Sequence, residues 1–224
     1  MNVLQAQFQL PAFFDLGATF LWAVSGAGMG VRRGYDYTGI FVMAFVSAVG
    51  GGLLRDGIFL QQVPIAIREP RYLVVVLLGA IVGTIASVLA GRRKPARGYR
   101  MLLDVVDALG LGAYACVGAQ MTLQMHLGVA AAILVGVVNA VGGGLLRDVL
   151  VNKVWMMPGQ LQAIAALAGV VIFVTLVEAT AIGPTGAAWS AIAATFVIRL
   201  LAIRYDWRTR ALLPDDELNR IADR

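Results

Sequence analysis

Seven runs of about twenty apolar residues follow one another along the chain, and they limit the folds that are open to it. A helix of about 20 apolar residues spans the hydrocarbon core of a bilayer. Lipid offers no hydrogen-bond partners, and the runs are too long and odd in number for barrel strands, so each must be a helix. The predicted spans are 10–31, 37–60, 71–90, 103–125, 127–151, 160–181 and 185–203. We expect an all-α membrane protein with seven transmembrane helices in a single domain, residues 1–224.

Composition excludes several other classes of protein. Charged residues make up 14% of the chain, whereas a soluble domain has about 25%. One cysteine, Cys116, and one histidine, His126, cannot form an internal disulfide or a four-ligand zinc site. Nucleophile-elbow, nucleotide-loop and zinc-protease motifs are missing from the sequence, so we expect no enzyme, cofactor or metal site. Because the basic residues lie in loops between apolar runs, we expect no nucleic-acid partner.

Lysine and arginine are distributed unevenly between the two sets of loops. One set holds eleven of them and the other only Arg68 and Arg71. The eleven are Arg32, Arg33, Arg92, Arg93, Lys94, Arg97, Arg100, Lys153, Arg204, Arg208 and Arg210. Basic loops face the cytoplasm, so this bias predicts an inner-membrane protein with its N-terminus outside and its tail, 205–224, inside. Five of these residues, Arg92, Arg93, Lys94, Arg97 and Arg100, form a cluster that we expect to contact anionic lipid headgroups.

The chain contains an internal duplication with an offset of 92 residues. Residues 46–56 read VSAVGGGLLRD and residues 138–148 read VNAVGGGLLRD, which match at ten of eleven positions. Each unit, 10–90 and 103–181, has three predicted spans, so the second unit starts on the opposite side of the membrane from the first. We therefore predict two inverted repeats followed by a seventh helix, 185–203. Inverted repeats are typical of transport proteins, whose pathway runs along the repeat interface.

A triple glycine interrupts the second span of each repeat. Three glycines remove side-chain packing and leave the backbone unshielded, which favours a helix break or kink at these positions. Polar backbone at membrane depth requires either burial in protein or contact with water. The triplets therefore mark either a water-lined path or a very close helix crossing. The predicted pore residues are Gly50, Gly51, Gly52, Gly142, Gly143 and Gly144, with Ser47 and Asn139 at equivalent positions one turn earlier.

Ionisable residues follow each triplet at the edge of an apolar run, where a charge is costly unless it is paired or hydrated. These are Arg55 and Asp56 in the first repeat and Arg147 and Asp148 in the second. The predicted topology places Asp15 at the membrane level of Arg55, and Asp107 at that of Arg147. We predict the ion pairs Asp15–Arg55 and Asp107–Arg147, one near each end of the pore. The alternative is that both arginines extend to lipid headgroups.

The doubled GGGLLRD motif on spans two and five, the three-plus-three-plus-one organisation and the basic loop between the units resemble the prokaryotic branch of the trimeric intracellular cation channel (TRIC) family. Its sequences are also labelled glycine transporter. The resemblance covers about residues 10–204. It implies a homotrimer in which each protomer encloses a hydrophilic pore for K⁺ and Na⁺, with spans two and five kinked at the glycines. The lysine-bearing motif of the animal members is not found here, so their voltage and lipid regulation is not carried over.

Three functions are considered: two kinds of transport, and a structural or assembly role. The first is a monovalent cation channel, and the alternative is a secondary transporter of a small solute such as glycine. Both are built from inverted repeats. The ionisable residues lie toward the helix ends, with glycines and small polar groups between them, which suits a hydrated path with weak binding. The sequence therefore favours the channel.

Overall fold

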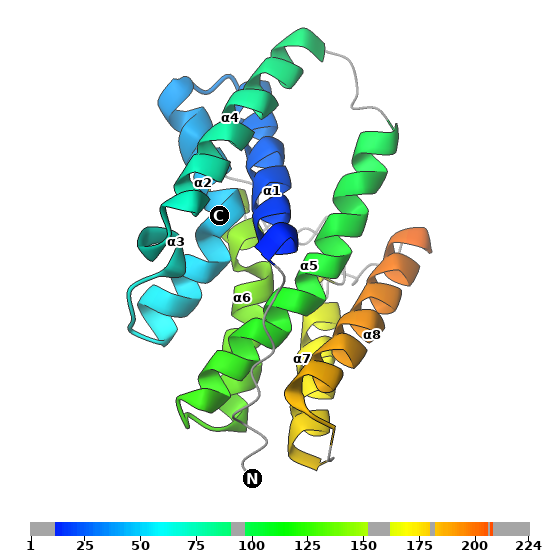
Figure 1. The fold of residues 1–224 in the computed structure, drawn as a ribbon. Coiled ribbons are helices and arrows are strands. Elements are labelled where there is room, and N and C mark those ends of the chain that lie inside the picture. The colour runs from blue at the N-terminus through cyan, green and yellow to red at the C-terminus, as the bar shows by residue number, and fades with distance from the viewer. Residues whose placement is uncertain (1–11, 91–96, 152–161, 180–181, 206, 208–224) are drawn as a thin grey trace, which may run out of the picture.

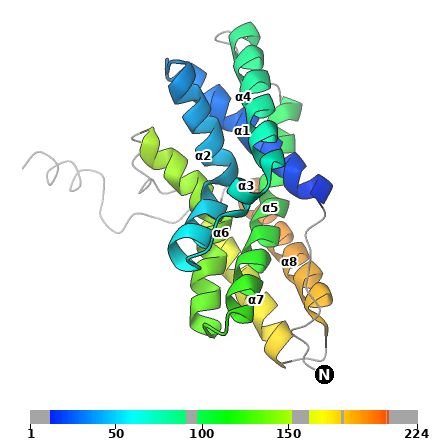
Figure 2. The ribbon, with the colours of Figure 1, turned by 60° about the vertical axis from the view of Figure 1, so that its left-hand side comes forward.

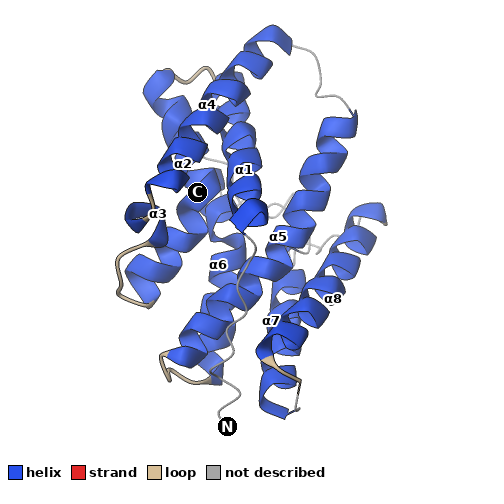
Figure 3. Ribbon diagram, in the orientation of Figure 1, coloured by secondary structure: helices blue, strands red, loops and turns tan. Residues whose placement is uncertain are grey.

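The computed structural model describes residues 12–90, 97–151, 162–179, 182–205 and 207, and in these segments every regular element is helical (Figure 3). A short α3 precedes α4, and α2 continues directly into a π-helical turn, η2. The elements are α1 (Ala12–Arg32), α2 (Tyr37–Leu53), η2 (Leu54–Phe59), α3 (Ile65–Arg68), α4 (Pro70–Ala90), α5 (Arg97–Gln124), α6 (Val129–Leu150), α7 (Gln162–Ala179) and α8 (Pro184–Arg204).

Six helical segments in the described residues are long and apolar enough to cross a membrane. They are Tyr37–Phe59, Pro70–Ala90, Asp104–Gln124, Val129–Leu150, Gln162–Ala179 and Pro184–Arg204, and each coincides with one of the predicted spans. The chain is therefore an all-α, multi-span membrane protein. The first predicted span, 10–31, corresponds to α1, which is not among the six. The count of seven spans stays a prediction.

Local sequence signals set several of the helix ends. The Asp36 side chain accepts a hydrogen bond of 2.8 Å from the Gly39 N–H and so caps the start of α2. The hairpin between α5 and α6 turns through Gly128 at φ +88°, a conformation that favours glycine. Pro184 occupies the first turn of α8, where its missing N–H leaves no hydrogen bond unmade.

The long helices form two groups that meet at α2 and α6 (Figures 1 and 2). In the first group α1, α2 and α4 enclose a core with Ala23, Ala44 and Ala80. In the second group α5, α6, α7 and α8 pack around a larger core that includes Ala115, Cys116 and several more alanines. Small side chains let helix backbones approach closely, which is the usual basis of helix packing in lipid.

Within each group, the first helix of the repeat packs against the second. The residues that make this contact in one group lie 92 positions from those that make it in the other. A Cβ added to Gly26 on α1 would collide with Ser47 and the Met43 carbonyl on α2. A Cβ added to Gly118 on α5 would lie 2.9 Å from the Asn139 Cβ and 3.0 Å from the Val135 carbonyl oxygen on α6. Each partner in the second contact is the duplicate of its counterpart in the first, so the sequence repeat is matched by equivalent helix contacts.

Candidate functional site

The glycine triplets of α2 and α6 cross each other. A Cβ on Gly50 would lie 3.2 Å from the Gly143 Cα, and a Cβ on Gly142 would lie 3.3 Å from the Gly51 Cα. A Cβ on Gly51 would collide with the Asn139 carbonyl oxygen. The first two glycines of each triplet therefore allow two backbones to touch, which is one of the two interpretations that the sequence left open.

The third glycine of each triplet faces open space. A Cβ on Gly52 would have one neighbour within 4 Å, the Arg55 guanidinium at 3.9 Å, and a Cβ on Gly144 would have only that of Arg147, at 3.8 Å. Both glycines line a cavity. The two interpretations therefore both apply: the first two glycines of each triplet form the close crossing, and the last two, Gly51 and Gly52 or Gly143 and Gly144, line the small cavity.

The helices are not interrupted at the glycines, so the expected break is wrong, while a kink there stays a prediction. The backbone is α-helical through both triplets, and α6 continues as an α-helix to Leu150. In α2 the departure from α-helical geometry begins only after the triplet, at Leu54, where the Leu60 N–H bonds to the Arg55 carbonyl five residues earlier. Glycine has a low helix propensity, but here the facing backbone packs directly against the glycines. This contact stabilises the helical conformation, so the helix is not interrupted.

Two cavities lie beside this crossing. The small cavity has a volume of about 230 Å³, and its walls include Ser47, Asp104, Asp107, Gln162, Arg147 and Arg199. The large cavity has a volume of about 650 Å³, and its walls include Asp15, Arg55, Asp56, Glu69, Tyr72 and Gln124. Asp15 and Arg55 thus share the large cavity, and Asp107 and Arg147 share the small one, while their predicted common membrane levels stay a prediction. Asp148 lines neither cavity.

A wall of four residues separates the two cavities: Ala48, Gly52, Tyr114 and Asn139 line both. Asn139 holds the wall together, since its Nδ2 donates to the Tyr114 carbonyl at 2.7 Å and its Oδ1 accepts from Arg55 Nη1 at 3.4 Å. The duplicate of Asn139, Ser47, lines the small cavity and is only 8% exposed, yet its hydroxyl has no hydrogen-bond partner. A buried hydroxyl of this kind is normally satisfied by an ordered water.

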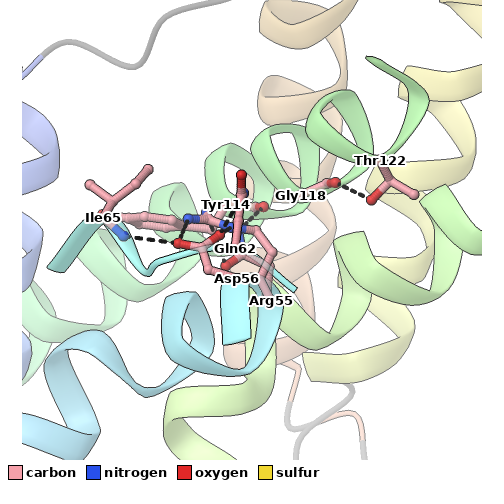
Figure 4. Close-up of polar contacts among 8 residues, drawn as sticks. Arg55, Asp56, Gln62, Ile65, Tyr114, Gly118 and Thr122 are labelled. Carbon is pink, nitrogen blue, oxygen red and sulfur yellow. Dashed lines mark hydrogen bonds and ion pairs between the residues drawn. The ribbon is translucent and has the colours of Figure 1, made fainter. Parts of the chain in front are cut away.

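The predicted ion pair between Asp15 and Arg55 is wrong, because Arg55 pairs with its neighbour Asp56 (Figure 4). Its Nε and Nη2 donate to the two carboxylate oxygens at 2.6 and 2.9 Å. Asp56 also accepts from the Ile65 backbone N–H at 3.0 Å and from Gln62 Nε2 at 3.4 Å, which ties η2 to the start of α3. Arg55 is 5% exposed, so it does not extend to headgroups either.

Asp15 is bound by two tyrosines that the sequence analysis did not identify. Tyr72 of α4 and Tyr114 of α5 both donate their phenol hydrogen to the Asp15 carboxylate. The repeat offset offered a signal for one of them, since Tyr114 is the duplicate of Trp22 and the two rings lie 5.2 Å apart. Residues at the same repeat position that touch each other lie where the two repeats meet.

The predicted pair of Asp107 with Arg147 is wrong in the same way. Asp107 accepts from Arg199 Nη2 of α8 at 3.5 Å and from Gln162 of α7 at 3.3 Å. Arg147 donates to its neighbour Asp148 at 3.2 Å, and both side chains are about a quarter exposed. Arg199 is 3% exposed, and it could not be assigned from the repeat because α8 lies outside the duplication.

The predicted lipid contacts fall largely outside the described structure. Arg92, Arg93 and Lys94 lie outside the described residues, and Arg97 and Arg100 begin α5 with side chains that are not described. The headgroup contacts of this cluster stay a prediction.

Comparison with known proteins places the chain in a family. A family model described as "Glycine transporter" matches residues 12–88 and 104–178. The chain is 31% identical over 195 residues to the UPF0126 inner membrane protein YadS of Escherichia coli (strain K12), covering 86% of this chain and 91% of YadS. It is 34% identical over 193 residues to a UPF0126 membrane protein of Vibrio cholerae, covering 85% and 78%.

Solved structures resemble the whole fold. The TRIC trimeric intracellular cation channel orthologue from Rhodobacter sphaeroides superposes with a TM-score of 0.71 and 30% identity, over 87% of this chain and 97% of that one. A structure reported for conductance through TRIC cation channels superposes with a TM-score of 0.79 and 25% identity, over 92% and 99%. From the duplicated glycine motif, the two cavities at their crossing and these likenesses together, the chain belongs to the TRIC family, in the branch labelled glycine transporter.

Proposed function

We propose that the chain is a cation channel whose path leads from the large cavity, past the wall of Ala48, Gly52, Tyr114 and Asn139, into the small cavity. The observation that carries this proposal is the pair of cavities beside one helix crossing that share this wall and have charged and polar side chains in their lining. The solved structures that resemble this chain are described as TRIC cation channels, which supports the same conclusion. The path uses side chains from both repeats.

The permeating ions are monovalent, K⁺ and Na⁺. The cavity walls offer carboxylate, hydroxyl and amide oxygens, which suit hard cations. In the segments that the structure describes, no cluster of three acidic, histidine or cysteine side chains is arranged to hold a metal ion. The buried, unpaired Ser47 hydroxyl implies water in the small cavity, and a hydrated path binds ions weakly enough to release them.

The topology of the proposed channel is two inverted repeats of three spans followed by α8, with α1 as the first span. Support comes from the equivalent contacts of Gly26 with Ser47 and of Gly118 with Asn139, and from the touching duplicates Trp22 and Tyr114. The basic bias of the loops supports an inner-membrane location with the N-terminus outside and the C-terminus in the cytoplasm. The Rhodobacter sphaeroides relative is described as trimeric, which supports a homotrimer.

A secondary transporter of a small solute such as glycine is the second candidate. The family description names glycine, and a closed wall between two cavities also suits alternating access. The channel is favoured because the wall is made of small and polar groups without a charge-complementary pair that would bind a zwitterion at the crossing.

Recording currents from the purified full-length chain in planar bilayers, under a KCl gradient, tests the proposal. The channel predicts discrete conductance steps and a reversal potential displaced toward that of K⁺. Saturable uptake of glycine by reconstituted vesicles, without conductance steps, would contradict it and support the transporter.

A further inference from the structure

The Asp15 carboxylate is the charge in the large cavity that has no opposite charge bound to it. The cavity walls carry four aspartate, glutamate and arginine side chains: Asp15, Arg55, Asp56 and Glu69. Arg55 and Asp56 neutralise each other, and Glu69 is paired with Arg71 at 2.7 Å. Among the ion pairs of the described segments none includes Asp15, which is held instead by the phenols of Tyr72 and Tyr114.

The duplicate of Asp15 shows how the same position is neutralised in the other repeat. Asp107 lies 92 residues later and lines the small cavity, where the Arg199 guanidinium approaches it at 3.5 Å. Arg199 is supplied by α8, which has no counterpart in the first repeat. The two equivalent carboxylates therefore differ in one respect: Asp107 has a cation attached to the chain, and Asp15 does not.

The geometry points to a binding site for one monovalent cation in the large cavity, formed by Asp15, Tyr72 and Tyr114. Each phenol donates its hydrogen to Asp15 and keeps lone pairs on its oxygen, so three side chains present oxygen to an ion. A hard cation such as K⁺ or Na⁺ prefers oxygen ligands. The inference rests on the proposed function, since the ion that binds is the ion that permeates.

The charge balance selects a monovalent ion. A single positive charge beside Asp15 reproduces the neutral state that Arg199 gives Asp107, whereas a divalent ion would leave an excess charge at a site with one carboxylate. Calcium sites usually combine several carboxylates with carbonyl oxygens. The cavity volume of about 650 Å³ leaves room for the ion to keep part of its water shell, with the Gln124 amide also in the wall.

Ion-dependent thermal stability of the full-length protein in detergent tests the site without measuring flux. We expect KCl to raise Tm relative to N-methyl-D-glucamine chloride at the same ionic strength, because an ion that binds only the native state stabilises it by mass action. Asp15→Asn should abolish the K⁺-specific rise. Tyr72→Phe, which keeps the carboxylate, should raise the half-saturating K⁺ concentration about tenfold, the factor that corresponds to about 1.4 kcal/mol.

The matched control is Glu178→Gln. Glu178 is exposed near the end of α7 and lines neither cavity, so this variant should keep the full K⁺-specific rise. An equal rise in wild type, Asp15→Asn and Glu178→Gln would overturn the site. If Asp15→Asn does not fold, the shift in half-saturation for Tyr72→Phe decides in its place, and an unchanged value there overturns the site.

Anomalous scattering from crystals soaked in Tl⁺ locates the ion. The wild type should show a peak beside Asp15, and Arg199→Gln should add a second peak beside Asp107, because that carboxylate loses its attached cation. A wild-type map without a peak at Asp15 overturns the inference even if the protein conducts K⁺. Conversely, a protein that binds Tl⁺ at Asp15 but passes no current would retain the site and lose the proposed channel function.

Discussion

At the scale of single residues, the two Arg–Asp pairs that follow the glycines are chemically identical but sit in different surroundings. Arg55 and Asp56 are 5% and 1% exposed, and Asp56 has two further hydrogen-bond donors. Arg147 and Asp148 are about a quarter exposed and share a single 3.2 Å contact. Breaking a buried pair leaves an uncompensated charge, whereas an accessible pair contributes little to stability.

Neutralising the two aspartates should therefore have unequal effects. Asp56→Asn leaves the Arg55 guanidinium buried without its counter-charge and should lower the free energy of unfolding by about 3–5 kcal/mol. Asp148→Asn should change it by less than about 1 kcal/mol. Chemical or thermal unfolding of both variants in detergent checks this. Equal losses for the two would mean that the repeats bury their arginines to the same extent, contrary to the structure.

The sequence predicted most of the charged residues of the site but not their partners. The topology placed Asp15 at the membrane level of Arg55, and Asp107 at that of Arg147; in the structure the first two line the large cavity and the second two line the small one. The pairings differ because contacts of three other kinds intervene: a chain neighbour for Arg55, phenols from α4 and α5 for Asp15, and an arginine from α8 for Asp107. Among these contacts, only that of Tyr114 left a signal in the sequence, because Tyr114 is the duplicate of Trp22.

At the scale of helices, the long apolar runs were sufficient to place most of the elements, because lipid requires each of them to be helical along its whole length. The short elements η2 and α3 were not anticipated. They depend on the Asp56 carboxylate, which accepts the Ile65 backbone N–H across the intervening loop. A hydrogen bond between residues nine apart becomes visible only once the chain is folded.

The second and third glycines of a triplet differ in how closely the facing helix approaches them, and this difference leads to a prediction about helix packing. Gly51→Ala places a methyl group against the Asn139 backbone of α6 and should destabilise the protein by about 1–3 kcal/mol, as overpacking usually does. Gly144→Ala meets only the end of the Arg147 side chain at 3.8 Å. Since alanine favours a helix over glycine, this control should be neutral or stabilising by up to about 1 kcal/mol.

Thermal unfolding of the two glycine variants in the same detergent distinguishes these expectations. Loss of stability in both would indicate that the third glycine is also packed, and that the small cavity does not reach it. No loss in Gly51→Ala would indicate that α2 and α6 can separate at little cost.

At the scale of the whole molecule, the proposed orientation can be checked with single cysteines. Cys116 is fully buried and should not react with a membrane-impermeant maleimide in intact cells. His126→Cys, in the exposed turn between α5 and α6, should be labelled from outside. Tyr37→Cys, at the 89% exposed start of α2, should be labelled only after permeabilisation.

The reverse labelling pattern would invert the molecule and contradict the positive-inside argument. Labelling of both positions from one side would contradict the inverted arrangement, because α2 and α6 would then start on the same side of the membrane.

In the proposed channel, the wall between the cavities would also determine where an applied voltage acts. If water fills both cavities and they open to opposite sides of the membrane, the potential falls mainly across Ala48, Gly52, Tyr114 and Asn139 rather than over the full thickness of the bilayer. An elementary charge that crosses the whole potential changes in energy by about 2.3 kcal/mol per 100 mV. The Arg55 guanidinium, hydrogen-bonded to Asn139, would then lie in this focused field. A displacement of a few ångströms at this position therefore couples to the electric field as strongly as a much longer movement elsewhere in the protein.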